Sequence, residues 1–207
     1  MVMRKIVVFA SGGGTDFQSV IDANETSKFC EIAYLVASKP NIGAIERAKQ
    51  HGIKTIVYEK ESGESMEEFY ARLTALFMAE QVDYLLLAGW LKIIPESFIL
   101  SFQDKIVNIH PSLLPSFGGK GYYGLKVHEA VLAYGAKVSG ATVHFVEAEV
   151  DGGAIIAQQC VRVENNDTPE TLQQRVLAIE HTLLPQTMRL LCEGKVQKNG
   201  RFVKVFE

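Results

Sequence analysis

The sequence predicts an α/β protein with a doubly wound, mostly parallel sheet and an antiparallel addition toward the C-terminus. Two observations support this fold class. In the first half of the chain, short apolar runs alternate with amphipathic segments, which is typical of parallel strands joined by helices. In the second half, two segments of alternating apolar residues flank an acidic turn that contains glycines, which indicates an antiparallel hairpin.

The first half of the chain contains the predicted parallel strands and the helices that connect them. The strands are expected at residues 6–10, 32–37, 53–57 and 84–88, and the helices around residues 17–21, at 42–51 and at 66–79. The apolar runs are short and bounded by glycine or polar residues, whereas the segments between them have helical periodicity.

The second half is expected to begin with a buried strand and to end with a long helix and a hairpin. The elements are a strand at residues 106–109, a helix at 127–134, hairpin strands at 138–146 and 154–163, a helix from 168 to about 191 and a short hairpin at 195–206. Thr168 caps the long helix, and Pro169 occupies its first turn.

The composition limits the possible partners and compartment. The 207 residues suit one domain or two closely packed subdomains, and a net charge of −3 with both signs interspersed excludes a nucleic-acid or anionic-membrane surface. No stretch approaches the roughly 18 apolar residues of a membrane span. Cys30, Cys160 and Cys192 lack paired spacing, so we expect reduced core thiols and a cytoplasmic protein. The scattered histidines predict no metal site.

A glycine-rich loop, Ser11-Gly12-Gly13-Gly14-Thr15, joins the first strand to the first helix. Such a junction presents backbone N–H groups at the positive end of a helix, so a phosphate is the expected ligand, although a tight turn also uses glycine. The loop lacks a Walker lysine, and Phe17 stands where a dinucleotide fingerprint has its third glycine. Ser38-Lys39 follows the second strand in place of the acidic residue that holds an NAD ribose. The sequence therefore favours a monophosphate.

Asn108 and His110 occupy the end of the strand that opens the second half. Pro111 keeps His110 extended, and residues two apart on a strand share a face. The carboxamide and the imidazole can therefore converge on one small group, hold an oxyanion and handle a proton. On these residues alone, a strand-end cap at His110 and a satisfied backbone group at Asn108 are the commoner interpretation.

The segment Asn108-Ile109-His110-Pro111-Ser112-Leu113-Leu114-Pro115 resembles the signature of the folate-dependent formyltransferases, in particular the phosphoribosylglycinamide formyltransferase family. The resemblance spans most of the chain. It also includes Ala10 to Thr15, Ala88 to Ile94, Val143 to Val146, Asp151-Gly152-Gly153 and Glu180-His181.

The resemblance implies a fold, a reaction and a set of site residues. It implies one Rossmann-like formyltransferase domain over residues 1–207, with a phosphate-binding half at 1–105 and a catalytic and folate-binding half at 106–207. It implies transfer of a formyl group from the cosubstrate 10-formyltetrahydrofolate to the amine of 5-phosphoribosylglycinamide. The catalytic residues would be Asn108, His110 and Asp151. The folate contacts would be Leu91, Lys92, Ile93, Ile94 and Asn108. The substrate contacts would be Gly13, Gly14, Thr15, Asp16, Phe17, Gln18 and Glu180.

Without the resemblance, several of these residues have plainer interpretations. Residues 91–94 could be a hydrophobic strand-to-helix connection, and Glu180, at the edge of a buried helix stripe, could be a surface charge. Glu147 and Glu149 are expected in a solvated turn. Asp151 differs from them because the two glycines that follow it allow close backbone approach.

The chain departs from the family pattern at two places. Asp16 stands beside the phosphate loop where the family commonly has Asn, and we expect its carboxylate to turn outward, away from a phosphate. The loop at residues 116–124, expected to be mobile or to cover the substrate, leads into Lys126 where the family has a histidine. We therefore expect no catalytic role for Lys126 and a structural role for His128.

Other functions stay open at the level of the sequence. Methionyl-tRNA formyltransferase and formyltetrahydrofolate hydrolase share the central signature but normally carry a further domain, for which we expect no room in this chain. A non-catalytic nucleotide-binding module would use the glycine loop and leave Asn108, His110 and Asp151 unexplained. We expect small-molecule partners and a monomer or homodimer.

Overall fold

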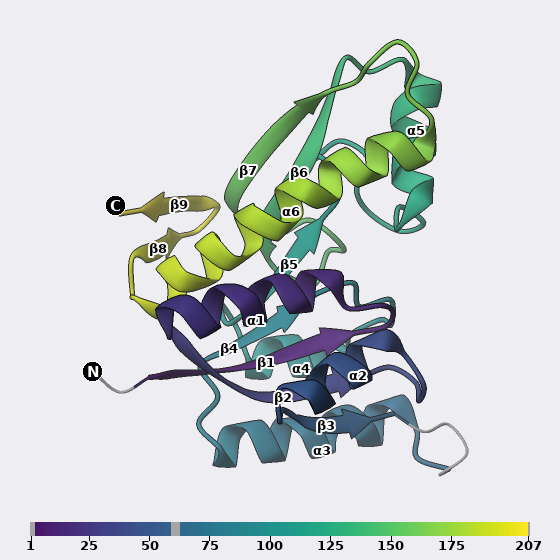
Figure 1. Cartoon of the computed structure of the whole chain (residues 1–207). Helices are drawn as coiled ribbons and strands as arrows, with labels where there is room; N and C mark the ends of the chain where they lie inside the picture. The colour runs from purple at the N-terminus through teal and green to yellow at the C-terminus, as the bar shows by residue number, and fades with distance from the viewer. Residues whose placement is uncertain (1–2, 59–62, 207) are drawn as a thin grey trace. The chain divides into compact units, whose positions relative to one another are not determined.

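The computed structural model describes residues 3–58 and 63–206 (Figure 1). The chain forms two compact units, one ending at Val107 and one beginning at Asn108. Over the described residues the strands form a seven-stranded sheet in the order β3-β2-β1-β4-β5-β6-β7 and a separate two-stranded sheet of β8 and β9. This topology confirms the predicted doubly wound, mostly parallel sheet with an antiparallel addition.

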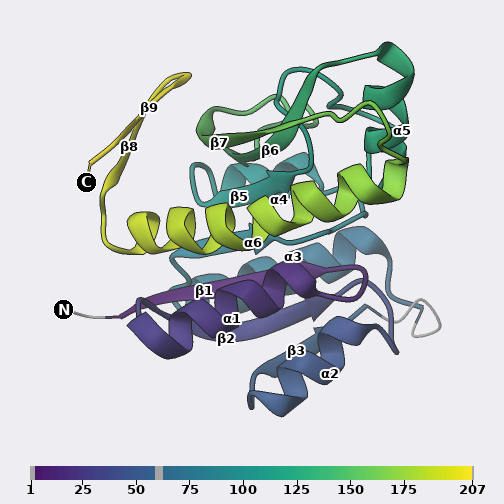
Figure 2. The same ribbon diagram turned by 45° about the horizontal axis from the view of Figure 1, so that its top comes forward.

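The first unit consists of parallel strands covered by helices. Its elements are β1 (Arg4–Ala10), α1 (Thr15–Ser27), β2 (Cys30–Ala37), α2 (Gly43–Gln50), β3 (Lys54–Val57), α3 (Met66–Ala79), β4 (Tyr84–Leu87) and α4 (Glu96–Ser101). Strand β1 pairs in parallel with β2 and β4, and β2 pairs in parallel with β3. Helices α1 and α2 cover one face of these strands, and α3 and α4 cover the other (Figure 1, Figure 2).

The core of the first unit is built on β1. Residues Ile6 to Ala10 are fully buried, which explains their continuous apolar run because a strand covered on both faces has no polar side. Phe9 makes an edge contact with Trp90 at a ring-centroid distance of 5.2 Å. The Trp90 indole N–H donates to the Tyr70 hydroxyl at 3.0 Å, and burial raises the pKa of Tyr70. These contacts fix the chain at Trp90, where the expected folate segment begins.

Among the described residues of the first unit, helix α4 is the one element that the sequence did not predict. It has 6 residues, too few for a periodic apolar pattern to be recognised. Pro95 precedes it and Phe98 is its buried residue.

The second unit contains the remaining strands and two helices. Its elements are β5 (Ile106–His110, whose first residues belong to the first unit), α5 (Leu125–Tyr134), β6 (Val138–Phe145), β7 (Ile155–Arg162), α6 (Pro169–Cys192), β8 (Val196–Asn199) and β9 (Phe202–Val205). Strands β6 and β7 are antiparallel, as are β8 and β9, which confirms both predicted hairpins. Helix α6 packs against α5, β6 and β7 (Figure 1).

Helix α6 begins and packs as its sequence predicts. Thr168 accepts a hydrogen bond from the Thr171 backbone N–H at 3.3 Å, which caps the helix. The Arg175 guanidinium donates to both Asp167 oxygens at 2.8 and 2.9 Å and holds the pKa of that carboxyl well below its usual range. The predicted apolar stripe is buried along its length: Leu172, Val176, Ile179 and Leu183.

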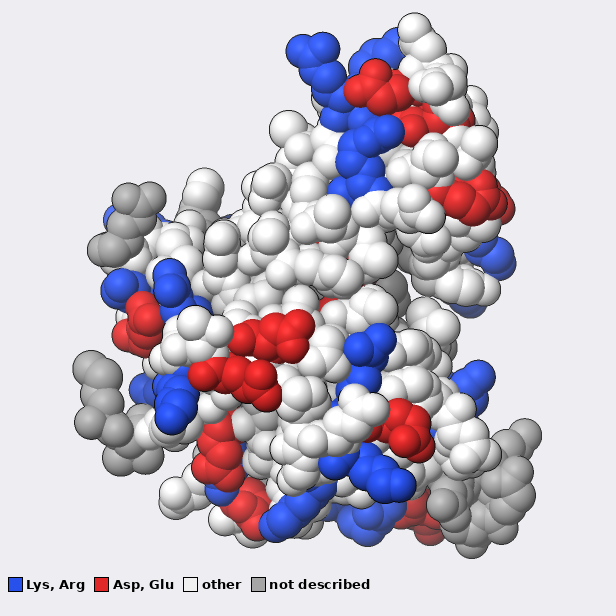
Figure 3. Space-filling model, viewed as in Figure 1, with Lys and Arg blue, Asp and Glu red and all other residues white. Residues whose placement is uncertain are grey.

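The surface differs from expectation at one cysteine. Cys30 is buried and Cys192 is half-buried, but Cys160 is exposed, so the expectation of a core thiol is wrong for Cys160. Strand β7 is the last strand of the sheet, and its residues around Cys160 face solvent despite apolar sequence neighbours. Basic and acidic side chains are interspersed over the face drawn in Figure 3.

Neither a membrane-spanning helix nor a metal-ligand cluster is present among the described residues. Among residues 3–58 and 63–206, no helix combines the length and apolar character that crossing a membrane requires. The same part of the chain contains no group of three or more His, Cys, Asp and Glu side chains placed to hold a metal ion.

Candidate active site

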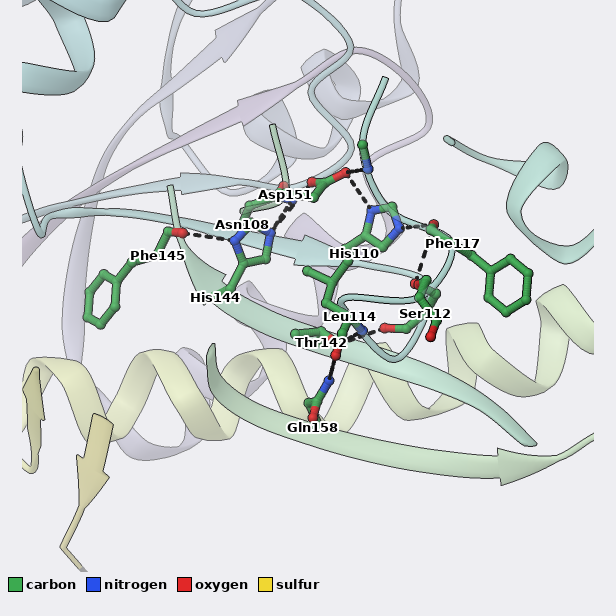
Figure 4. Close-up of polar contacts among 12 residues, drawn as sticks. Asn108, His110, Ser112, Leu114, Phe117, Thr142, His144, Phe145, Asp151 and Gln158 are labelled. Atoms are coloured by element: carbon green, nitrogen blue, oxygen red, sulfur yellow. Dashed lines mark hydrogen bonds and ion pairs between the residues drawn. The ribbon is translucent and has the colours of Figure 1, made fainter. Parts of the chain in front are cut away.

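Asn108, His110 and Asp151 lie together in the second unit (Figure 4). Asn108 and His110 come from β5, and Asp151 comes from the turn between β6 and β7. Nδ1 of His110 lies 3.5 Å from Oδ2 of Asp151, and their side chains are 5% and 12% exposed. The structure therefore brings the three expected catalytic residues to one largely buried place.

Both ring nitrogens of His110 are engaged. Nε2 lies 2.9 Å from the Phe117 carbonyl oxygen, and because a carbonyl oxygen can only accept, Nε2 carries a proton and donates it. Nδ1 faces the Asp151 carboxylate, which also only accepts when ionised. The imidazole is therefore held between the Phe117 carbonyl oxygen and the Asp151 carboxylate.

Asn108 is oriented by His144 of β6. The Phe145 carbonyl oxygen lies 2.8 Å from His144 Nδ1, which places the proton on Nδ1 and leaves Nε2 as an acceptor. The Asn108 carboxamide N–H donates to that Nε2 at 3.0 Å. Burial lowers the pKa of His144 and keeps the ring neutral. Sequence reasoning included His144 in the resemblance but gave it no role.

Asp151 is held by backbone groups that need glycine nearby. The Gly119 N–H donates to Asp151 Oδ2 at 2.9 Å. Asp151 itself has a positive φ of 55°, a conformation that Asp tolerates better than most residues. A side chain at Gly153 would collide with the Phe145 carbonyl oxygen. The Asp-Gly-Gly motif thus lets the turn approach β6 closely.

A buried hydrogen-bond network shapes the turn that carries the Phe117 carbonyl (Figure 4). The Thr142 hydroxyl donates to the Ser112 carbonyl at 2.6 Å and accepts from the Leu114 N–H at 3.0 Å. Gln158 donates to the Leu114 carbonyl at 2.9 Å, and the Ser112 hydroxyl donates to the Ser116 carbonyl at 2.6 Å. Ser112 and Thr142 are fully buried. These bonds fix the backbone that places the Phe117 oxygen against His110.

The second unit also has a cavity apart from these residues. It has a volume of about 510 Å³ and is lined by Leu113, Ser116, Phe117, Tyr122, Tyr134, Ala136, Lys137, Val138 and Ser139. None of the three expected catalytic side chains lines it. Lys120 is exposed in the neighbouring loop, and whether that loop covers a substrate stays a prediction.

In the first unit, the glycine loop leads directly into the N-terminus of α1. The Ser11 N–H donates to the Gly89 carbonyl at 3.1 Å, and Gly14, at φ 72°, forms the N-cap of α1. Among the described residues, the backbone N–H groups from Gly12 to Thr15 have no hydrogen-bond partner. Free N–H groups at a helix N-terminus are what an anion site requires.

The other expected substrate residues of the first unit differ in what they can offer. Phe17 is fully buried, so only its backbone can reach a ligand. The Gln18 carboxamide accepts from Arg47 at 3.1 Å and donates to Asp22 at 2.8 Å, so its side chain is already engaged. Oδ1 of Asp16 is buried, so the expectation of a carboxylate turned outward is wrong for this oxygen. Asp16 adjoins Phe17 in the first turn of α1, where the helix packs against the sheet.

The expected folate segment presents apolar side chains at the surface. Leu91 is 60% and Ile93 is 84% exposed, whereas Trp90 before them is buried. The Leu91 N–H donates to the Ser11 hydroxyl at 3.0 Å, which ties this segment to the glycine loop. Exposed apolar groups anchored by the backbone suit a flat aromatic ligand.

Glu180 is more buried than the sequence indicated. It is 7% exposed on α6, so the plainer interpretation of a surface charge is wrong. Burying a carboxylate is costly unless it is paired. His128, expected to be structural, is 1% exposed, and burial followed by the charge of His110 lowers its pKa to about 4.

Comparison with known proteins shows the class to which this doubly wound sheet and this Asn-His-Asp set belong. The family model described as formyl transferase matches residues 4–188, and the chain belongs to this family.

Two relatives and one solved structure illustrate the similarity. The chain is 44% identical to the chloroplastic phosphoribosylglycinamide formyltransferase of Vigna unguiculata over 95% of its own length and 64% of that protein. It thus spans less than two thirds of that relative. It is 36% identical to the phosphoribosylglycinamide formyltransferase of Bacillus subtilis (strain 168), over 91% of this chain and 95% of that protein. The crystal structure of glycinamide ribonucleotide transformylase 1 from Symbiobacterium toebii matches with a TM-score of 0.91 and 35% identity, covering 99% and 95% of the two chains.

Proposed function

We propose that this chain transfers the formyl group of 10-formyltetrahydrofolate to the amine of 5-phosphoribosylglycinamide in de novo purine biosynthesis. The observation that carries the proposal is the placement of Asn108, His110 and Asp151 around one site in a member of the formyl transferase family. The names of the relatives from Vigna unguiculata and Bacillus subtilis support the choice of acceptor.

The reaction is an acyl transfer between two nitrogens. The neutral amine of the substrate attacks the formyl carbon, a new C–N bond forms, and the formyl oxygen becomes an oxyanion. The bond from that carbon to N10 of the folate then breaks, and the proton lost by the amine ends on N10. An amine is already a good nucleophile, so the protein contributes orientation and charge stabilisation and needs no covalent intermediate.

Asn108 and His110 would stabilise the oxyanion. The Asn108 amide has a second N–H beyond the one given to His144, and the His110 Nε2–H would turn from the Phe117 carbonyl to the formyl oxygen. Asp151 would orient His110 and would help to carry the proton from the amine to N10. Hydrogen-bond donors that already point at the developing oxyanion before the reaction usually make the largest single contribution to the rate enhancement.

The remaining residues would bind the two substrates. Residues Gly13 to Gln18, at the end of the glycine loop and the start of α1, would hold the phosphate chiefly through backbone N–H groups. Glu180 would bind the glycinamide end of the same substrate. Leu91 to Ile94 would contact the pterin through backbone and apolar groups, together with Asn108. No metal is part of this proposal. We infer that the protein works in the cytoplasm as a monomer or homodimer, on small molecules and not on nucleic acid.

A direct comparison of acceptors tests the proposal. Purified protein is given 10-formyltetrahydrofolate with 5-phosphoribosylglycinamide, with initiator methionyl-tRNA, or with water alone, and formylated products are measured by mass spectrometry. We expect rapid formation of formylglycinamide ribonucleotide only. Formate released at the same rate without an amine would identify a hydrolase, and formylmethionyl-tRNA would identify the other alternative; either result contradicts the proposal.

A further inference from the structure

Helix α2 lies directly against the glycine loop of the first unit. The Ala44 N–H donates to the Gly12 carbonyl at 3.2 Å, and Arg47 Nε donates to the Gly13 carbonyl at 2.8 Å. Two consecutive carbonyl oxygens of the loop are therefore bonded to α2. Neither the periodicity of the sequence nor the resemblance singled out Arg47.

The approach of α2 to the loop is close enough to explain two glycines. A Cβ atom at Gly14 would lie 2.7 Å from the Ala44 Cβ, and one at Gly43 would lie 3.1 Å from the Gly13 carbonyl oxygen. The distance at Gly14 is shorter than real Cβ contacts allow and the distance at Gly43 is tight, so a side chain at Gly14 would push the loop away from α2. The glycines at positions 14 and 43 thus allow α2 to lie close enough to the loop for Arg47 to bind the Gly13 carbonyl oxygen.

Arg47 is held in place by a second contact, with α1. Its Nη1 donates to the Gln18 carboxamide oxygen at 3.1 Å. The Gln18 nitrogen in turn donates to Asp22 at 2.8 Å and lies 3.2 Å from His51 Nε2. These bonds fix which end of the Gln18 carboxamide faces Arg47, so the guanidinium is anchored on both the loop and the helix that follows it.

These contacts have an electrostatic consequence for a phosphate at the loop. A carbonyl oxygen directed at a phosphate would repel it, whereas the N–H groups on the other side of the same peptides attract it. By binding the Gly12 and Gly13 oxygens, α2 directs them away and leaves the N–H groups from Gly12 to Thr15 without partners among the described residues. Arg47 also brings a permanent positive charge to the loop and uses two of its five N–H donors there.

We propose that Arg47 is a positioning residue for the substrate phosphate: it holds the Gly13 carbonyl out of the phosphate site and supplies the positive charge beside the loop. The proposal deepens the proposed function, since it rests on a phosphorylated substrate that binds at this loop. Gln18, which the family resemblance implies as a substrate contact, acts here by fixing Arg47.

Substitution of Arg47 with a matched control tests the proposal. Lys49, also in the last turn of α2, makes no side-chain hydrogen bond or ion pair with the described residues, so Lys49→Ala removes the same charge from the same helix. For Arg47→Ala we expect the KM for 5-phosphoribosylglycinamide to rise about tenfold, with kcat within about twofold of the unsubstituted protein. For Lys49→Ala we expect both constants to stay within about twofold.

A comparison of substrates separates positioning from a general structural role. The same glycinamide riboside without its phosphate should be used equally by the unsubstituted protein and by Arg47→Ala, because the lost interaction involves the phosphate alone. Arg47→Gln keeps an N–H donor but loses the charge, and Arg47→Lys keeps the charge but loses the planar guanidinium. The KM of each variant for the phosphorylated substrate should lie between that of the unsubstituted protein and that of Arg47→Ala. An equal loss for both substrates, or an unchanged KM for the phosphorylated one in all three variants, would overturn the proposal.

A binding measurement keeps this proposal separate from the formyl-transfer reaction. Ribose 5-phosphate is titrated into each protein, and the backbone amide signals from Gly12 to Thr15 are followed by NMR. We expect saturable shifts in the unsubstituted protein and in Lys49→Ala, and a Kd about tenfold higher in Arg47→Ala. If this pattern holds while no formyl transfer occurs, the proposed function fails and the role of Arg47 stands. If formyl transfer occurs but Arg47→Ala binds ribose 5-phosphate as well as Lys49→Ala does, the role of Arg47 fails alone.

Discussion

His110 and Asp151 face each other across 3.5 Å, Nδ1 to Oδ2, with both side chains almost buried. The Gly119 N–H fixes the same Asp151 oxygen at 2.9 Å, and the Phe117 carbonyl fixes the opposite side of the imidazole at 2.9 Å. At this separation and burial, solvent screens the interaction between the two side chains little. The contact therefore fixes the orientation of the imidazole that is proposed to meet the formyl oxygen.

Removing the charge of Asp151 should slow the chemical step selectively. We expect Asp151→Asn to lower kcat by roughly a hundredfold or more and to leave KM for both substrates nearly unchanged, because the lost interaction matters most in the transition state. Glu147, whose contact with Lys198 at 3.0 Å is partly exposed, is a control in the same turn, and Glu147→Gln should leave kcat within about twofold. Steady-state kinetics of the unsubstituted protein, Asp151→Asn and Glu147→Gln test this prediction. A near-normal kcat in Asp151→Asn would exclude Asp151 from the mechanism.

His144 should act through Asn108. His144→Phe keeps a ring in the buried site but removes the acceptor for the Asn108 amide, so the carboxamide loses its fixed orientation. We expect kcat to fall about tenfold or more, and we expect Asn108→Ala combined with His144→Phe to be little slower than Asn108→Ala alone. Losses that multiply in the double variant would show that His144 contributes independently of Asn108.

The folate segment should depend on its apolar side chains and not on its lysine. Ile93 is 84% exposed next to exposed Lys92, so each can be changed without disturbing the core. We expect Lys92→Ala to leave the KM for 10-formyltetrahydrofolate within about twofold, and Ile93→Ser to raise it about threefold to tenfold through lost apolar contact. If Lys92→Ala abolished folate binding in a folded protein, the lysine side chain would be a direct ligand.

The buried His128 should make stability depend on pH. Its pKa is lowered from 6.5 to about 4. As the pH falls, the unfolded chain is therefore protonated at this histidine near pH 6.5, whereas the folded protein is protonated there only near pH 4. The contribution is therefore complete above pH 6.5 and is lost between pH 6.5 and 4. With the side chain 1% exposed, the loss amounts to about 3 kcal/mol.

Denaturant unfolding of the unsubstituted protein and of His128→Leu at pH 7 and pH 4.5 measures this contribution. The free energy of unfolding should fall by about 2 to 3 kcal/mol less in the variant over this interval. An identical decrease in both proteins would mean that His128 titrates alike in the folded and unfolded states.

The sequence predicted the fold well where packing repeats along the chain. Strand β1 is buried on both faces, which explains its continuous apolar run. Helix α6 is buried on one face, which explains its apolar stripe, and the structure confirms both predicted elements. Helix α4 was not predicted because six residues give no period, and the exposure of Cys160 depends on β7 lying at the sheet edge, which composition does not reveal.

The candidate site was predictable only in part for a related reason. Strand alternation pairs Asn108 with His110, and the resemblance adds Asp151. The Phe117 carbonyl and the Gly119 N–H could not be predicted, because any residue offers these backbone groups and only the turn geometry directs them. Arg47 has the sequence context of a surface charge, and its contact with Gly13 appears only when α2 is placed against the loop.

His110 and Asp151 are proposed to act as one catalytic unit, and a double-variant cycle on kcat tests this most directly. The rates of formyl transfer by His110→Ala, Asp151→Asn and the variant with both changes are compared with that of the unsubstituted protein. Because Asp151 is proposed to act mainly by orienting His110, Asp151→Asn should slow the His110→Ala protein far less than it slows the unsubstituted protein. A double variant slower by the full product of the two single losses would show that the residues act independently and would contradict the account.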